Sequence, residues 1–71
     1  MGFTVKSEMA GVVAAVEIEE GAAVTEDDAV VILSAMKMEI PISAGRSGSV
    51  AEILVAEGDV VKAGQPLFVI G

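Results

Sequence analysis

The stretch from residue 11 to residue 33, GVVAAVEIEEGAAVTEDDAVVIL, decides the fold because the chain repeats its pattern 37 positions later. Residues 48–70 read GSVAEILVAEGDVVKAGQPLFVI and align with the first stretch without a gap. The alignment matches the leading glycines and also the Glu-Gly turns that end at Gly21 and Gly58. Two copies are too few for a solenoid, which needs about three. We therefore expect a pseudo-twofold pair of β units folded over one core.

Each copy consists of short apolar strands separated by turn residues. A strand of about six to eight residues comes first and partly alternates, as in Val-Glu-Ile-Glu at 16–19. After the Glu-Gly turn, a second turn contains Gly64 in the later copy and Asp27 in the earlier one, and both residue types tolerate a positive φ. A short apolar strand closes the unit. The sequence predicts an all-β protein, a flattened barrel or sandwich of two antiparallel sheets with almost no helix.

The composition fixes the size of the protein and excludes several kinds of site. With 71 residues the chain forms one domain, 1–71, which has too little core to enclose a substrate pocket as well. It contains no cysteine and no histidine, which excludes disulfides, thiolate nucleophiles, imidazole bases and zinc sites of the usual ligands. An enzyme working alone is therefore the least favoured function.

The charge and the hydropathy pattern exclude several classes of partner. A formal net charge of −7 argues against nucleic acid and against anionic membranes. No apolar run approaches the roughly 18 residues that a membrane-spanning helix needs. The acids at positions 19, 20, 26, 27 and 28 are either a solvated rim or a surface for a basic partner, and their spacing matches no calcium loop. We expect a cytoplasmic protein, or a protein of an organellar matrix if the domain belongs to a longer chain, that is monomeric in isolation.

The segment between the two copies, 34–47, has no partner in the alignment and contains the sequence SAMKMEIP. Met36 and Lys37 lie between two strand candidates, AVVILSA and MEIPIS. Two residues between antiparallel strands form a tight turn, and such turns usually contain Asn-Gly or Asp-Gly. A broken local rule at an exposed tip indicates that the residues serve something other than folding. We expect the lysine hairpin, 34–39, to project Lys37 from the end of the barrel far from both termini.

The motif around the lysine resembles that of a known family. AMKM followed by Glu-Ile resembles the attachment site of biotinyl domains, and the whole chain is similar to the biotinyl/lipoyl attachment domain family, above all to its small free-standing members. The resemblance extends over MAG (9–11), SAMKMEIPI (34–42), RSG (46–48) and EGDVVKAGQPL (57–67). It implies a barrel-sandwich hybrid of two four-stranded sheets. No thumb-like insertion, present in some family members, interrupts the first copy.

The resemblance implies a biotin carboxyl carrier that itself catalyses nothing. A biotin protein ligase would join Lys37 to the valeryl carboxylate of biotin, and the ring would carry a carboxyl group from a biotin carboxylase to a carboxyltransferase. An ordinary lysine is almost wholly protonated near neutral pH, so the ligase has to supply an activated acyl-adenylate. The side chain and the biotin tail together span about 12–14 Å. The arm is long enough to enter a pocket while the acidic barrel stays outside.

The resemblance also implies a set of recognition residues around the lysine, namely Ala35, Met36, Met38, Glu39 and Gly21. The two methionines are suited to a surface that fits several partners, or else they fill the open end of the barrel. Glu39 either orients the lysine or solubilises its strand. Gly21 lies sixteen residues before the lysine, a spacing that in the family places a turn beside the hairpin, and its other role is that of a backbone kink.

One departure from the family pattern bears on the choice of acyl group. The family usually has a glutamate three residues before the lysine, where this chain has Ser34. In lipoyl domains that acid helps the lipoylating enzymes to select their target, and the lysine is flanked by Asp and Ala. A lipoyl carrier is therefore the less favoured alternative, and an unmodified barrel that acts as an adaptor is the third.

Overall fold

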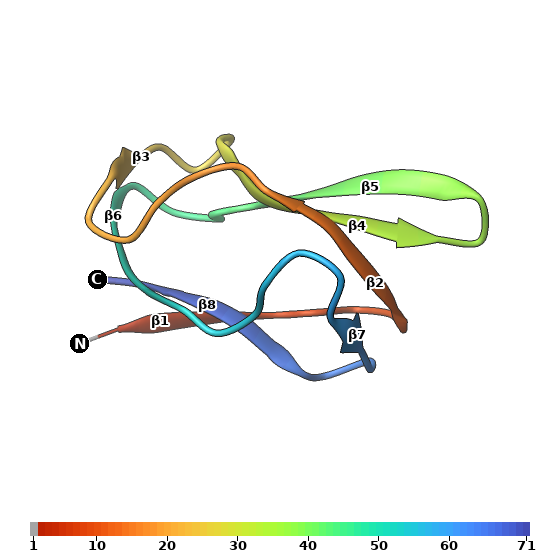
Figure 1. The fold of residues 1–71 in the computed structure, drawn as a ribbon. Helices are drawn as coiled ribbons and strands as arrows, with labels where there is room; N and C mark the ends of the chain where they lie inside the picture. Colours follow the sequence, from red (N-terminus) through yellow and green to blue (C-terminus); the bar gives the residue numbers. More distant parts are fainter. Residues whose placement is uncertain (1) are drawn as a thin grey trace.

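The computed structural model describes residues 2–71, so residue 1 of the predicted domain lies outside the described part. Eight strands and no helix form in these residues, arranged as two four-stranded antiparallel sheets packed face to face (Figure 1). One sheet has the order β1 (Phe3–Lys6), β8 (Pro66–Ile70), β6 (Gly48–Ile53), β3 (Ala23–Val24). The other has the order β5 (Met38–Ser43), β4 (Ala29–Ala35), β2 (Gly11–Val16), β7 (Val60–Val61). The predicted fold class is confirmed. The described residues include no helix able to span a membrane.

The internal repeat is visible in individual backbone hydrogen bonds. The N–H of Gly21 donates to the carbonyl oxygen of Val50 at 2.7 Å, and the N–H of Gly58 donates to that of Val13 at 2.8 Å. Gly58 lies 37 positions after Gly21, and Val50 lies 37 positions after Val13. Each copy therefore donates the same hydrogen bond to the other, as a twofold axis requires. Gly21 and Gly58 have φ values of 90° and 93°, which glycine adopts without steric cost.

The second turn differs between the two copies in its backbone conformation. Gly64 has a φ of 84°, whereas Asp27 is not among the residues with positive φ. The prediction that Asp27 takes over the left-handed position was therefore wrong. A side chain in that region costs about 1–2 kcal/mol. The earlier turn avoids this cost, and it is closed by Asp28, whose N–H donates to the Thr25 carbonyl oxygen and whose carboxylate accepts the Thr25 N–H at 2.8 Å.

The structure extends the repeat to strands that the sequence alignment left unmatched. Leu33 pairs with Ile40 between β4 and β5, and Ile70 pairs with Phe3 in the same way between β8 and β1. Both ladders continue in equal steps and shift register at equivalent positions. β5 is therefore the counterpart of β1, and only residues 35–38 have no described counterpart. Side-chain identity is lost between these two strands while their pairing is kept, which is why the alignment missed them.

Both copies contribute to a single core. Five pairs of buried hydrophobic residues occupy equivalent positions in the two copies, Val13 with Val50, Val24 with Val61, Val30 with Leu67, Val31 with Phe68 and Leu33 with Ile70. A chain of this length buries too little surface for two separate cores. Each half therefore depends on the other for its folding.

The lysine hairpin and the chain ends lie at opposite ends of the molecule. In Figure 1 the turn that joins β4 to β5 is at one end, while the start of β1 and the end of β8 are at the other. The molecule measures 31 Å in its longest direction and 17 Å in each of the other two. The expected position of the hairpin, far from the chain ends, is confirmed.

Candidate functional site

Lys37 lies in a two-residue turn with an unusual backbone. Ala35 and Met38 form the last pair of the β4–β5 ladder, so Met36 and Lys37 alone make the connection. Their φ values are 53° and 65°, as a type I′ hairpin requires. Each left-handed residue with a side chain costs about 1–2 kcal/mol relative to the ordinary helical region. The chain thus places two long side chains where the backbone favours Asn-Gly, as the sequence indicated.

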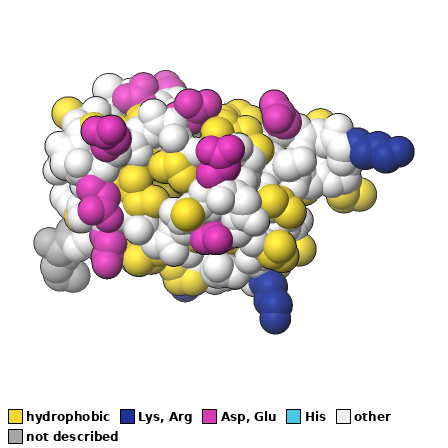
Figure 2. All heavy atoms as spheres, viewed as in Figure 1, with side chains coloured by type: hydrophobic (Ala, Val, Ile, Leu, Met, Phe, Trp, Pro, Cys, Tyr) yellow, Lys and Arg dark blue, Asp and Glu magenta, His cyan; other side chains and the backbone are white. Residues whose placement is uncertain are grey.

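The side chains of the turn are open to solvent. Lys37 is exposed, Met36 is 92% exposed and Met38 is 63% exposed, whereas Ala35 is buried at the base of the hairpin. Figure 2 shows a basic side chain that projects beyond the body of the molecule at the hairpin end. The alternative in which the methionines fill the open end of the barrel is wrong for Met36, because almost none of its side chain is covered. The amine of Lys37 is accessible to a macromolecular partner.

Ser34 and Glu39 lie directly opposite each other on the face of the hairpin that points away from the core. They form one pair of the β4–β5 ladder, and both are exposed. Side chains of directly opposed residues lie on the same face of a sheet, and like charges there are destabilising. A glutamate at position 34, usual in the family that the sequence resembles, would lie directly opposite Glu39. Serine avoids that repulsion and leaves Glu39 as the one acid of the pair.

Gly21 does not lie beside the lysine hairpin. Its N–H is bonded to Val50, and Val50 pairs with Ile70 near the end of the chain. Figure 1 shows the segment between β2 and β3 at the end opposite the hairpin. The expectation that the sixteen-residue spacing brings Gly21 next to Lys37 was wrong. The φ of Gly21 gives it the alternative role, that of a backbone turn.

Gly11, the leading glycine of the first copy, supports the hairpin, a role that was not predicted from the sequence. A Cβ atom at Gly11 would lie 2.7 Å from the carbonyl oxygen of Ser34 and 3.2 Å from the Cβ of Ala35. Its counterpart Gly48 has the same kind of contact, 2.6 Å from the carbonyl oxygen of Gly71. Close approach of β2 to the base of the hairpin therefore requires glycine. The signal for this role was the recurrence of glycine at the head of both copies.

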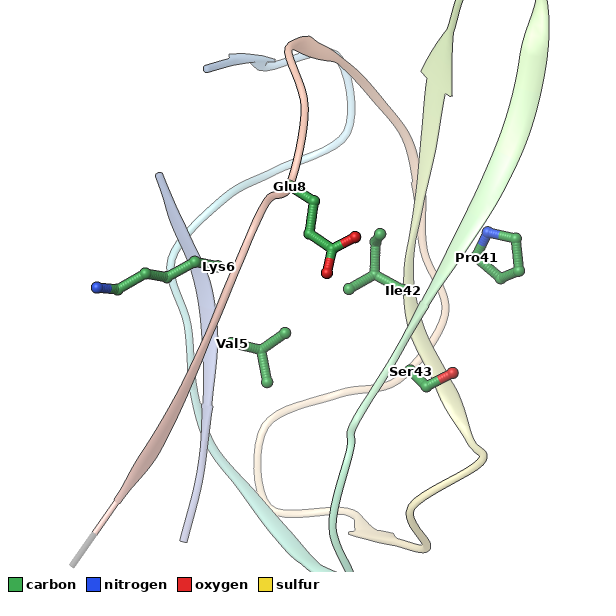
Figure 3. A pocket seen from close by; sticks show the side chains of 6 residues that line it. All are labelled: Val5, Lys6, Glu8, Pro41, Ile42 and Ser43. Carbon is green, nitrogen blue, oxygen red and sulfur yellow. The ribbon is translucent and has the colours of Figure 1, made fainter. Parts of the chain in front are cut away.

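A hollow of about 240 Å³ separates the two edge strands β1 and β5 and lies away from the lysine turn (Figure 3). Its lining residues are Val5, Lys6, Glu8, Pro41, Ile42 and Ser43. In Figure 3 the carboxylate of Glu8 points toward Ile42, while the Lys6 side chain points away from the hollow. Val5 and Ile42 are repeat counterparts, so the hollow lies where the two copies meet. The hollow therefore does not place the amine of Lys6 near Lys37.

The chain matches known proteins over nearly its whole length. Residues 3–70 match the family model described as "Biotin-requiring enzyme". The chain is 40% identical to the biotinylated protein TB7.3 homolog of Mycobacterium leprae, with 99% of each chain covered. It is 45% identical to the biotin/lipoyl attachment protein of Bacillus subtilis, with 93% of this chain and 90% of the relative covered.

Solved structures show the same fold inside much larger enzymes. The urea carboxylase of Kluyveromyces lactis contains a region that superposes on the whole chain with a TM-score of 0.95 and 35% sequence identity. This chain spans only 6% of that carboxylase. An exposed lysine on a hairpin, in a barrel that matches carboxylase domains and full-length attachment proteins, is explained by one assignment: the chain belongs to the biotin/lipoyl attachment domain family.

Proposed function

We propose that this chain is a biotin carboxyl carrier in which Lys37 holds biotin covalently. The single observation that supports this most is the exposed amine on a left-handed two-residue turn, at the end of a barrel of a biotin-requiring family. A biotin protein ligase attaches the biotin, and the loaded chain serves a biotin carboxylase and a carboxyltransferase. The relation to the urea carboxylase and to the biotinylated M. leprae protein supports biotin over lipoate.

The attachment is an acyl transfer to the amine. The Nζ of Lys37 loses one proton to become the nucleophilic amine and a second as the amide forms. It forms a C–N bond to the valeryl carbonyl of the activated acyl-adenylate, while the C–O bond to the adenylate breaks and AMP leaves. The product amide carries no charge, so the formal net charge of the chain falls from −7 to −8. The chain contributes an amine that a ligase can reach, and the ligase contributes the activation.

The residues present fit a tethered group of this size. The turn holds the lysine beyond the end of the barrel, and the arm of about 12–14 Å extends from there. When bound, biotin supplies a ureido nitrogen that accepts a carboxyl group and releases it. The body of the barrel stays outside the partner's pocket, since the attachment point lies at one end of a molecule 31 Å long.

Intact mass spectrometry tests this proposal. The chain is incubated with a purified biotin protein ligase, biotin and ATP, and in parallel with a lipoate-attaching enzyme, lipoate and ATP. We expect the mass to rise by one biotinyl group, located on the peptide that contains Lys37, and no lipoyl addition. Lys37→Arg keeps the charge and abolishes the addition. Lys62→Arg, on the second copy, is the matched control and keeps it.

A wild-type chain that gains no biotin beside an active ligase contradicts the proposal. A lipoyl addition in place of biotin makes the chain a lipoyl carrier. Biotin on Lys62 in the Lys37→Arg variant would contradict the assignment of the attachment site to Lys37.

A further inference from the structure

Exposed apolar side chains gather on the sheet that carries the lysine. Among the described residues, the exposed large hydrophobic side chains are Val12, Met36, Met38, Leu54 and Val60. All except Leu54 belong to the strands of that sheet or to its β4–β5 turn. Val60 is the most exposed of those within a strand, at 74%. Apolar side chains that are exposed together beside a proposed attachment site indicate contact with another molecule.

The register shows that these residues form a continuous row across the outer face of the sheet. Val60 lies opposite Val12, Val12 opposite Ser34, and Ser34 opposite Glu39. Directly opposed residues share a face, and all of these are exposed. The row starts on the edge strand β7 and ends on β5, two residues from Lys37.

The repeat provides an internal control for this row. The counterparts of Val60, Val12, Ser34 and Glu39 are Ala23, Ser49, Gly71 and Gly2. Ala23 pairs with Ser49, and Ser49 exchanges backbone hydrogen bonds with Gly71, as Val60, Val12 and Ser34 pair in the row itself. The neighbouring outer row shows the same bias at two of its three positions, because Pro41 and Ala15 correspond to Thr4 and Glu52, whereas Ile32 corresponds to Val69. The other copy therefore keeps its strand pairing with small or polar residues at the positions of Val12 and Val60. Folding does not explain the valines of the lysine-bearing sheet.

We propose that the outer apolar patch, made of Val12, Val60, Ile32 and Pro41, is the docking surface for the biotin protein ligase; this inference rests on the proposed function. The ligase has to bring its acyl carbonyl into bonding contact with the lysine amine, which is joined to the hairpin by one side chain. A carboxylase reaches the loaded group through the longer arm. The partner that must press against this end of the barrel is therefore the ligase.

The charge around the patch defines the surface that the ligase brings to it. Glu39 ends the row on one side, and Asp59 and Glu57 precede Val60 on the other, all of them exposed. On the face seen in Figure 2, hydrophobic side chains are exposed among acidic ones. Interfaces of this kind join an apolar centre to a polar rim of opposite charge. The ligase surface is accordingly apolar at its centre and basic at its edge.

Biotinylation kinetics with the 71-residue chain test the inference. Val12→Ser with Val60→Ala gives the row the residues that its own counterpart carries in the same pairings. Val12→Thr with Val60→Thr is a second variant that keeps branched side chains suited to strands. Leu54→Thr removes an exposed apolar side chain directly after β6, outside the lysine-bearing sheet, and is the matched control. The initial rate of biotin incorporation by a purified ligase gives kcat/KM, and thermal unfolding verifies the fold.

We expect kcat/KM to fall at least about tenfold in the Ser/Ala variant, less in the Thr pair, and to stay within about twofold of wild type in the control. Wild-type rates in both folded double variants overturn the inference and leave the proposed function intact. Normal biotin incorporation combined with slowed carboxyl transfer in these variants also overturns the inference and leaves the proposed function intact, because it assigns the patch to a carboxylase. A wild-type chain that takes up no biotin overturns the proposed function and this inference together.

Discussion

The two ends of the barrel have the same strand pairings but differ in what connects the strands. At one end β4 and β5 are joined by Met36 and Lys37. At the other end their counterparts β8 and β1 pair in the same register, although they are the last and first of the strands in residues 2–71. One strand pair needs a turn and the other forms without one. The pairing is therefore determined by the core and the ladders, and the residues of the turn are free to serve another purpose.

This freedom explains why a poor turn sequence persists at the lysine end. The strain of two left-handed residues with side chains is a local cost that the rest of the barrel tolerates. The equivalent strands at the other end carry no such strain, because the chain does not pass between them. The comparison predicts that the core sets the stability of both ends alike, and that the turn adds only a local term.

The largest expected effect is the loss of a core residue that both ends share. Phe68→Ala removes the largest fully buried side chain and costs about 3–5 kcal/mol, much of the stability of a small domain. Val31→Ala, at the equivalent position in the other copy, costs about 2 kcal/mol because less volume is lost. Urea denaturation followed by circular dichroism measures both changes. If one sheet of Phe68→Ala kept its amide protection while the other lost it, the single shared core would be refuted.

The sequence predicted the strands, the repeat and the lysine hairpin because each leaves a local pattern. Glu-Gly turns recur at fixed spacing, and two strand-like runs flank Met36 and Lys37. The equivalence of β5 and β1 could not be predicted, since Ile40 and Phe3 share a place in the ladder but no identity. Strand pairing depends on the alternation of side chains and on the register, and both are preserved while the residue types change.

The position of Gly21 shows a second limit of spacing along the chain. Counting back from the lysine, the chain first runs down the seven residues of β4, which at about 3.3 Å each carry it to the other end of the barrel. It has not returned when it reaches Gly21. A number of residues thus fixes a distance along the chain, while the direction of each strand decides which end a turn occupies. The sequence carried no signal for that direction beyond the repeat itself.

The turn itself gives the second largest expected effect. Met36→Asn with Lys37→Gly replaces two strained residues by a pair that favours type I′ turns, and we expect the free energy of unfolding to rise by about 2 kcal/mol. Biotin incorporation is lost at the same time. Lys37→Arg alone, which keeps a left-handed side chain, leaves the stability unchanged and separates the two effects. Thermal unfolding and intact mass measure them, and an unchanged or lower stability of the double variant would show that the turn is not strained.

The glycines of the first turns come next. Gly21→Ala and Gly58→Ala each force a side chain into the left-handed region, where nothing else lies within 4 Å, so each costs about 1 kcal/mol from backbone strain alone. Both variants should unfold at similarly reduced temperatures and take up biotin at wild-type rates. A loss of ligase kcat/KM in Gly21→Ala that Gly58→Ala does not share would restore Gly21 as a recognition residue.

The smallest expected effect concerns the side-chain hydrogen bond that each copy makes at its first turn. The carboxylate of Glu20 accepts the N–H of Ile53 at 2.8 Å, a bond that joins the two copies. In the second copy Asp59 acts locally instead, since its carboxylate accepts the N–H of Ala56 at 2.9 Å. Both bonds are exposed, so Glu20→Ala and Asp59→Ala should each lower the free energy of unfolding by about 0.5 kcal/mol. Glu57→Ala, at the counterpart of Glu20, is the control that should change nothing. Equal losses in the Glu20 and Glu57 variants would mean that charge, which both acids share, matters here more than the hydrogen bond.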